Sequence, residues 1–522
     1  MNRLYISALC ASLHAFAFAQ EAVDVQKLSD TELRGTAKHI SMAGATGAIG
    51  GDMSSVLVNP GGIGVYRSSD ISITPTLNIM TSNSGSLRRT DTKGTVNSAG
   101  FIVSVRTNSE SVRNVNFGFS YNRIMDFNRS QVGTTTLNTS YSNAIAAIAN
   151  SRNISESDIK TDGYNGYAPW NTVMAYKIGT ISPSSDGRNF HGLFTDNTSG
   201  YANFRTVESG AADEFAISVG GNTYDRFYWG ATLGIVDMVY RNNTYYEENL
   251  SNANLRNLID NVTTGSASVG MTNQLITRGT GVNAKVGFIY RPLPQVRLGF
   301  AIHTPTWYTL RDYYCAYADA NYSYISSDNK NSSKSYSSDT PTDGYTRYKI
   351  RTPWKFVVSA AGVIGRYAII SIDYQFDGYN TMNIEDTNGT QVVSVRNRIS
   401  DYYQPMHTVR IGAEFRITSS LSLRGGYSYQ SSPLRDETFN SDKEIATSGT
   451  MLYYALPHDT QYFTAGIGYK WRNFYLDLAY LRKVREYDYY SFSTNVSADI
   501  YSPKTKVTNR TNQLALTLGF RF

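Results

Sequence analysis

Strict alternation of apolar and polar residues at the end of the chain constrains its fold more than any other sequence feature. Leu514, Leu516, Leu518, Phe520 and Phe522 lie on one face of an extended strand, and the residues between them lie on the other. Such a strand suits a soluble sandwich, whose polar face meets water, and equally a membrane barrel, whose polar face lines the lumen. The rest of the chain has to separate these two folds.

The same alternation recurs along the chain and marks fourteen candidate strands. They lie near residues 70–80, 96–106, 113–123, 211–224, 226–238, 279–291, 295–304, 347–363, 366–376, 402–418, 420–431, 459–471, 472–485 and 511–522. Short connections, such as those near 225 and 365, alternate with long ones, such as 81–95, 124–210 and 239–278. Short periplasmic turns opposite long external loops are typical of outer-membrane barrels, and a soluble sandwich gives no reason for them.

The sequence therefore predicts an all-β fold, a 14-stranded antiparallel transmembrane β-barrel over residues 69–522, with long extracellular loops. An even number of strands places both ends of the barrel on the periplasmic side. Tryptophan placement agrees with this orientation. Trp229 and Trp471 lie beside predicted periplasmic turns, and Trp307 and Trp354 lie near predicted external ends, as interfacial aromatic belts require.

The start of the chain has the pattern of a secretory signal peptide. Arg3 precedes a short apolar run, and Ala17-Phe18-Ala19 forms a small-residue cleavage site before Gln20. We therefore expect residues 1–19 to be removed on export and the protein to reside in the cell outer membrane. The mature chain then keeps one cysteine, Cys315, which excludes an intramolecular disulfide framework.

A glycine-rich, apolar segment precedes the first predicted strand. Residues 42–64 contain seven glycines, and each costs a helix interior about 1 kcal/mol relative to alanine. Asn59-Pro60 adds a turn signal near the end of the segment. Because a segment this apolar and flexible needs an enclosure, we predict that residues 20–68 form an N-terminal hatch, or plug, inside the barrel lumen.

Several motifs occur in a characteristic order. The hatch contains those at 42–45, 50–54 and 59–64, and later ones lie at 303–308, 351–354, 373–374 and 410–416. With these motifs and an aromatic C-terminal residue, the chain resembles the FadL-type family of long-chain fatty-acid transporters of outer membranes. It is most similar to the branch often labelled hemin receptors or outer membrane transport proteins. The resemblance spans nearly the whole mature chain.

The resemblance implies that hydrophobic compounds such as long-chain fatty acids pass through a plugged barrel and leave by lateral diffusion. In the family an Asn-Pro-Ala turn of the hatch is important for passage. The corresponding turn here makes four residues the candidates for gating: Asn59, Pro60, Gly61 and Gly62. The family's lateral opening comes from a kink in the third strand, which corresponds to residues 115–121. Gly118 allows such a bend, although an interior glycine equally serves as lumen space.

Charged residues on the polar faces of the strands are the candidates for contact with the cargo, and they are Lys285, Arg410, Glu414, Arg416 and Arg424. Pairing across strands would satisfy a polar interior. An unpaired cation would instead hold a fatty-acid carboxylate. The sequence leaves both interpretations open.

No catalytic motif or metal-ligand spacing stands out, and the histidines of the mature chain are scattered. We therefore expect no enzyme activity, no metal and no cofactor. The expected partners are hydrophobic small molecules, outer-membrane lipid and the barrel-assembly machinery, the last through the C-terminal strand. The sequence contains no basic stretch of the kind that binds nucleic acid, so no nucleic-acid partner is expected. The protein is expected to be a monomer.

The long external loops support an alternative function, a surface receptor or adhesin for heme or a host ligand. The external loops are rich in Tyr, Asn and Ser, and residues 313–348, which are low in apolar aliphatic residues, are predicted to form a solvated or mobile loop. Helical spacing at 144–159 and 250–262 predicts two loop helices that close the mouth of the barrel. Under the receptor hypothesis, trimming 313–346 abolishes binding, whereas under the transport hypothesis it leaves transport intact.

Overall fold

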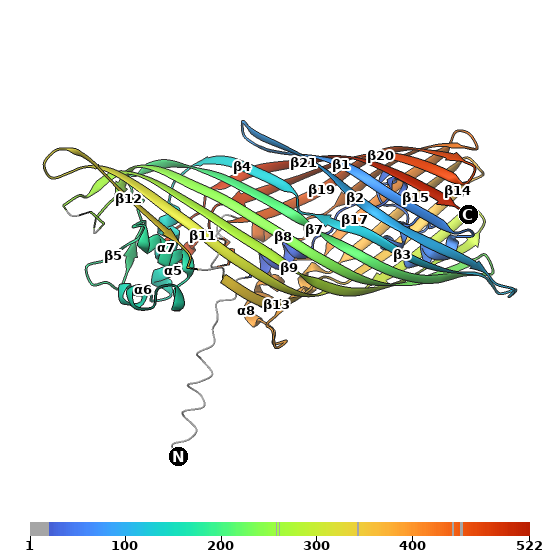
Figure 1. Ribbon diagram of the computed structural model, residues 1–522, viewed down its shortest axis with the longest axis horizontal. Coiled ribbons are helices and arrows are strands. Elements are labelled where there is room, and N and C mark those ends of the chain that lie inside the picture. The colour runs from blue at the N-terminus through green and yellow to red at the C-terminus, as the bar shows by residue number, and fades with distance from the viewer. Residues whose placement is uncertain are drawn as a thin grey trace, which may run out of the picture.

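The computed structural model describes residues 20–522, except residues 257, 260, 342, 343, 441, 442, 449, 450 and 452. The predicted signal peptide, residues 1–19, lies outside the described residues. Fourteen antiparallel spans form one closed barrel (Figure 1), which confirms the predicted fold. Several spans are interrupted, so they are built from more than one strand.

The uninterrupted spans are β1 (Asp70–Ser84), β2 (Leu87–Arg106), β7 (Ser199–Thr223), β8 (Phe227–Asn254), β9 (Thr264–Leu293), β17 (Met406–Arg416), β18 (Leu421–Gln430), β19 (Tyr454–Trp471), β20 (Phe474–Tyr490) and β21 (Lys504–Arg521). The interrupted spans are β3 with β4 (Val112–Asp126, Arg129–Thr136), β10 with β11 (Val296–His303, Trp307–Ile325), β14 with β13 (Lys355–Ile364, Gly344–Arg351) and β15 with β16 (Ala368–Asp377, Asn383–Glu385). The remaining strand of the sheet, β12 (Asn331–Asp339), pairs with β11 as an external hairpin.

Pairing of the first strand with the last closes the barrel. Ile71 of β1 lies opposite Phe520 of β21, and Leu77 lies opposite Leu514. Leu514 and Leu518 are exposed on the outer face, while Thr517 between them is buried on the inner face. The alternation in the sequence thus becomes an apolar exterior and a polar interior, which is the arrangement of a membrane barrel.

The strands extend farther than the alternation predicts. β8 has 28 residues and β9 has 30, so most of the predicted loop at 239–278 is strand. The predicted loop at 81–95 is likewise strand on both sides of a turn at 85–86. Polar residues there extend the ladder because the neighbouring strands supply backbone partners, a signal that hydrophobic periodicity does not carry.

Two further predictions about the external loops are wrong. The described residues of 250–262 contain no helix, because β8 continues to Asn254 and a turn follows. The predicted solvated loop at 313–348 is mainly β11, β12 and the start of β13. Tyrosine has a high β propensity, so a segment poor in aliphatic residues can still form strands. Trimming 313–346 would therefore cut into the sheet.

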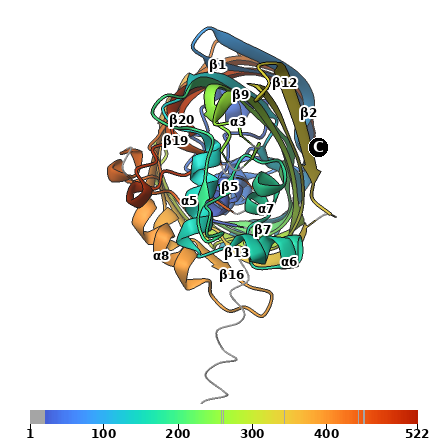
Figure 2. The ribbon, with the colours of Figure 1, turned by 90° about the vertical axis from the view of Figure 1, so that its left-hand side faces the viewer.

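Helices cover the external end of the barrel (Figures 1 and 2). The predicted helical region at 144–159 forms α5 (Tyr141–Ser151) and the start of α6 (Glu156–Asp162), and α7 (Trp170–Lys177) follows. A further helix, α8 (Val393–Tyr402), lies in the connection before β17. The remaining short elements are η2 (Gly163–Asn165), β5 (Ser182–Pro183), β6 (Phe190–His191), η3 (Tyr379–Thr381), η4 (Asp436–Phe439) and η5 (Val496–Ala498). No helix in the described ranges is long and apolar enough to cross a membrane.

The largest apolar cluster lies at this external end. It joins α5 and α7, through Ile145 and Val173, to inward-facing residues of β9 and β11 such as Met271 and Tyr314. The N-terminal helix adds Val25 to the same cluster. Apolar burial therefore closes the external half of the barrel interior.

The outer face provides a test of the orientation. Ile217 of β7 is 58% exposed, although it lies among other apolar side chains of the wall. We expect Ile217→Arg to destabilise the protein by about 2–4 kcal/mol, because it places a cation on the lipid-facing surface. Denaturant unfolding in lipid vesicles measures this cost. The control Ser199→Arg, at the exposed external end of the same strand, should cost little; equal costs would contradict the assignment.

Candidate functional site

The N-terminal segment, residues 20–68, lies within the ring of strands, where α3 is seen through the external end (Figure 2). Its helices are short: α2 (Ala22–Ser29), α3 (Ala37–Ser41), α4 (Ser55–Val58) and η1 (Pro60–Val65). Every residue from 41 to 50 is buried. A lumen filled in this way leaves no open channel along the described segment, which is the arrangement expected of the predicted hatch.

Wall glycines give this segment its room. A Cβ atom at Gly412 would lie 2.5 Å from the Met42 carbonyl oxygen, and one at Gly466 would lie 2.4 Å from the Ser41 Cβ. Both distances are shorter than packed atoms allow. Inward-facing glycines on β17 and β19 are therefore a sequence signal for the docking site of the segment, and the sequence reasoning did not use it.

Asn59, the first predicted gating residue, ties the segment to the wall. Its side-chain amide donates to the Gly47 carbonyl at 2.7 Å and to the Phe288 carbonyl of β9 at 3.0 Å. Its side-chain oxygen accepts from the Gly61 backbone amide at 2.9 Å, which caps η1. Pro60 occupies the first position of that helix, where its missing N–H costs no hydrogen bond.

The next two predicted gating residues allow close contact. A Cβ on Gly61 would lie 2.7 Å from the Phe288 Cα, and a Cβ on Gly62 would lie 2.7 Å from the Ser55 Oγ. The turn at 59–62 is thus fitted against the wall in this conformation. Movement of this turn away from the wall has to break the bond that Asn59 donates to Phe288, whereas its bond to Gly47 lies within the segment.

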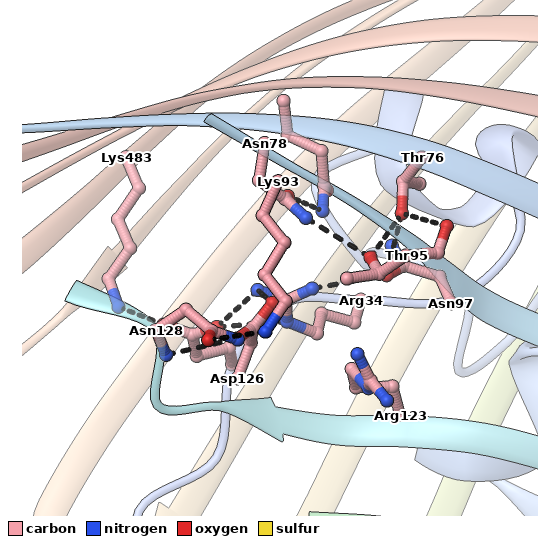
Figure 3. Close-up of polar contacts among 12 residues, drawn as sticks. Arg34, Thr76, Asn78, Lys93, Thr95, Asn97, Arg123, Asp126, Asn128 and Lys483 are labelled. Carbon is pink, nitrogen blue, oxygen red and sulfur yellow. Dashed lines mark hydrogen bonds and ion pairs between the residues drawn. The ribbon is translucent and has the colours of Figure 1, made fainter. Parts of the chain in front are cut away.

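Charged residues earlier in the segment anchor it to the opposite part of the wall (Figure 3). The Arg34 guanidinium lies 3.4 Å from Asp126 of β3 and donates to Asn97 of β2 at 3.1 Å. It also pairs with Glu32 at 2.9 Å, and Lys483 of β20 pairs with the same carboxylate at 2.6 Å. The sequence reasoning missed this network, although Asp30, Glu32 and Arg34 place three charges at alternate positions.

Three of the five predicted lumen charges are neutralised by partners. Lys285 forms an ion pair with Glu214 of β7. Arg424 binds Glu414 at 2.6 Å and also pairs with Asp477. These charges are buried, and their pairing satisfies a polar interior.

The other two predicted charges differ from these and from each other. Arg416 is exposed at the end of β17, and it forms no ion pair with any described residue. Arg410 lies in the lumen, where its Nη2 donates to the Gln375 side-chain oxygen at 2.7 Å. Its Nη1 is buried and has no hydrogen-bond partner in the described part of the chain. A buried guanidinium nitrogen without an acceptor is costly and marks a place for an anion.

A polar cavity of about 150 Å³ lies between the segment and the wall, and Arg410 is part of its lining. Lys355, His303 and Arg123 line it from the barrel, and Asp30 and Glu214 add negative charge. The His303 Nε2 lies 3.0 Å from the Val58 carbonyl, and the Lys355 Nζ donates to Thr31 at 3.0 Å. Arg410 thus has an unfilled hydrogen-bonding position beside free space.

A second hollow, of about 480 Å³, lies at the external surface between α5, α7, α8 and residues 444–448. Ile145, Ile148 and Ile445 give it an apolar lining, and the charged residues Arg152, Arg398, Glu21 and Glu444 also line it. Arg398 pairs with Glu21, so the hollow combines apolar surface with charges of both signs.

The predicted kink in the third strand is absent. Residues 115–121 of β3 pair without interruption with β2 on one side and β7 on the other. A Cβ on Gly118 would lie 3.2 Å from the Ile63 Cδ1, so this glycine makes room for the N-terminal segment and does not bend the strand. Register shifts occur in β3 only outside this stretch, between Val112 and Asn114 and between Arg123 and Met125, and β1 has one between Thr74 and Pro75.

The fold was compared with solved structures. A FadL homologue of Pseudomonas aeruginosa aligns with a TM-score of 0.52 at 13% identity, over 94% of this chain and 99% of that chain. The chain has the FadL-type fold. The Ralstonia pickettii toluene transporter TbuX aligns with this chain at 13% identity and a TM-score of 0.44, over 94% of this chain and 99% of the transporter. The Pseudomonas putida toluene transporter TodX aligns at 11% identity and a TM-score of 0.47, with the same coverage.

No protein-family model and no curated protein matches the sequence. Metal chemistry has no evident site: within the described residues, no group of three or more His, Cys, Asp or Glu side chains is placed to hold a metal ion.

The close contact of Gly61 with the wall can be tested by a substitution that adds one methyl group. Gly61→Ala places a Cβ against the Phe288 backbone, so we expect a loss of about 1–3 kcal/mol in unfolding free energy and a displaced segment. Ion conductance in planar bilayers and protease sensitivity of residues 20–68 report the displacement. The control Gly362→Ala adds a Cβ with no atom within 4 Å and should behave as wild type. Unchanged conductance and stability in Gly61→Ala would refute the close fit.

The contact between α2 and α8 predicts a pH dependence. Arg398 of α8 pairs with Glu21 at 2.8 Å, yet burial raises the pKa of Glu21 from 4.5 to about 7. The folded state thus holds this proton more tightly than the unfolded state. Its stabilising contribution is complete below pH 4.5 and is lost as the pH rises through about 7.

We expect Glu21→Gln to flatten the decline of Tm over this pH window, measured by thermal unfolding in detergent. Glu437→Gln, at an exposed glutamate of η4, serves as the control and should keep the wild-type slope. Parallel slopes for all three proteins would contradict the assignment to Glu21.

Proposed function

We propose that this protein transports hydrophobic molecules with an anionic head group, such as long-chain fatty acids, across the outer membrane. The observation that carries the proposal is the Arg410 Nη1, which is buried beside a polar cavity and lacks an acceptor among the described residues. A carboxylate offers the acceptor that this nitrogen needs, with charge-assisted hydrogen bonds. A neutral hydrocarbon offers none.

The surroundings of Arg410 support a role in binding. Gln375 bridges it to Asp377, since the Gln375 side-chain nitrogen donates to Asp377 at 2.8 Å while its oxygen accepts from Arg410. Asp373 is occupied by the Gly47 backbone amide at 2.9 Å. Neither carboxylate forms a direct ion pair with Arg410 in the described part of the chain, so the guanidinium stays available to a ligand.

The hollows of the molecule suggest where the transported amphiphile enters and leaves the barrel. The external hollow at Ile145 and Arg152 takes up the amphiphile, with its chain on the apolar lining and its head group near Arg152. Passage requires the turn at 59–62 to leave the wall, because the segment fills the lumen. The molecule then leaves sideways into the membrane by lateral diffusion.

The wall strand β1 is the proposed exit. Pro75 lacks an N–H, and neither Thr74 nor Pro75 is paired in the ladder with β21, whereas the residues on both sides are; the Thr74 hydroxyl alone contacts β21, at 2.8 Å from the Thr517 hydroxyl. An apolar hollow of about 1000 Å³ lies on the outer face beside this position, lined by residues such as Ile73, Phe101 and Phe520. Weak pairing beside an apolar surface suits the release of a hydrophobic chain.

Uptake by whole cells tests the proposal. A strain lacking the protein should take up labelled long-chain fatty acid more slowly, and the wild-type gene should restore the rate. Arg410→Gln should restore it only to about one tenth, because loss of a charged hydrogen bond costs on the order of 1.5–3 kcal/mol. Toluene uptake should be unaffected by the substitution.

Arg416→Gln is the matched control, since it removes an exposed arginine from the same strand. It should restore uptake in full. Equal uptake with and without the protein would overturn the proposed transport, and equal loss for the fatty acid and toluene in Arg410→Gln would overturn the role of the anionic head group.

A further inference from the structure

Three arginines form a row across neighbouring strands on the outer face of the barrel. Arg311 of β11 lies directly opposite Arg278 of β9 on one side and Arg347 of β13 on the other. All three side chains are exposed. Residues directly opposite each other in antiparallel strands have Cβ atoms about 5 Å apart, so three positive charges share a span of roughly 10 Å.

Such a row is unfavourable unless an anion accompanies it, since like charges directly opposite each other destabilise a sheet. None of the three forms an ion pair with another described residue. The nearest acidic residues by register are Asp237, which lies opposite Thr280 and therefore diagonal to Arg278, and Glu385, which lies opposite Lys349 and therefore diagonal to Arg347. Three guanidinium groups and the Lys349 ammonium group thus have two carboxylates at diagonal positions and none directly opposite.

The other contacts of the row are aromatic. The Arg347 guanidinium lies 5.3 Å from the centre of the Tyr345 ring and donates to its hydroxyl. Tyr345 in turn packs against Tyr313, with 5.3 Å between ring centres. These rings flank the arginines on the side away from the membrane band, and they leave the charges uncompensated.

The apolar outer face begins a short distance below the row. Trp307 lies four residues before Arg311 on β11, and its neighbour Val282 on β9 is 49% exposed. Trp307 itself is 47% exposed, as expected at a membrane interface. Four residues of strand span about 13 Å, and less in height because barrel strands tilt, so the arginines lie at the level of the outer-leaflet head groups.

We propose that Arg278, Arg311 and Arg347 bind the phosphate groups of a phosphorylated glycolipid, of the lipopolysaccharide type, in the outer leaflet. Guanidinium groups bind phosphate oxygens in pairs of parallel hydrogen bonds, which is the strongest match for this charge and geometry. The acyl chains lie on the apolar surface at Val282 and Trp307, and the sugars meet Tyr313 and Tyr345. This inference rests on the outer-membrane location in the proposed function.

Thermal unfolding in detergent tests it, with lipopolysaccharide as the added ligand. Lipopolysaccharide should raise the Tm of the wild type, and the triple variant Arg278→Gln, Arg311→Gln, Arg347→Gln should need at least about tenfold more lipid for the same rise. Without the lipid, the triple variant should be as stable as the wild type or more so, because it removes like-charge repulsion. That result also shows that the variant folds.

The matched control removes three exposed arginines at the short turns of the barrel: Arg366→Gln, Arg416→Gln and Arg472→Gln. It should respond to lipopolysaccharide as the wild type does. An equal loss in both triple variants would mean that net charge alone binds the lipid, and an unchanged response in the first would mean that the row does not bind it. Either result overturns the proposal.

Two further measurements, with other added ligands, identify which part of the lipid is bound. Dephosphorylated lipopolysaccharide should lose most of the stabilisation, and inorganic phosphate alone should give none. Equal stabilisation by inorganic phosphate would mean a free-anion site and would overturn the lipid assignment. The triple variant should keep fatty-acid uptake in cells, so its failure to bind lipid and a failure of the transport function are separate results.

Discussion

Closure of the strand ladder between β1 and β21 is the interaction on which the rest of the structure depends. Backbone groups in a membrane have no water to bind, so a sheet can span it only when no edge remains open. The pairs from Asp70 with Arg521 to Asn83 with Thr508 provide that closure. It also fixes which side chains face inward, since every second residue of each strand then points to the lumen.

A closed ring of this size encloses space that the wall side chains alone do not fill. The N-terminal segment and the external helices fill it by different means. Apolar contacts join α2, α5 and α7 to the outer half of the interior. Nearer the short turns, the segment depends on close contact with wall glycines and on ion pairs such as Lys483 with Glu32. The polar contacts hold the segment in place, and the cavity beside Arg410 remains between them.

Pairing divides the charges of the protein into two classes. Arg424 and Lys285 have carboxylate partners and maintain the interior. Arg410 in the lumen and the arginine row at Arg311 lack such partners in the described residues. The first class is structural, and we assign ligands to the second: a carboxylate within the barrel and lipid phosphates on its outer face. Unpaired cations therefore connect the proposed transport to the membrane around it.

The sequence by itself determined the barrel and which face of its strands is apolar. The alternation from Leu514 to Phe522 recurs in every span, and it is a local pattern that a single strand already expresses. Strand lengths were underestimated, because a polar strand such as β12 forms only where a neighbour supplies its backbone partners. The sequence could likewise list the lumen charges without telling the paired Arg424 from the incompletely bonded Arg410. That distinction, like the row at Arg311, depends on which strands become neighbours and in which register, and only the tertiary structure decides it.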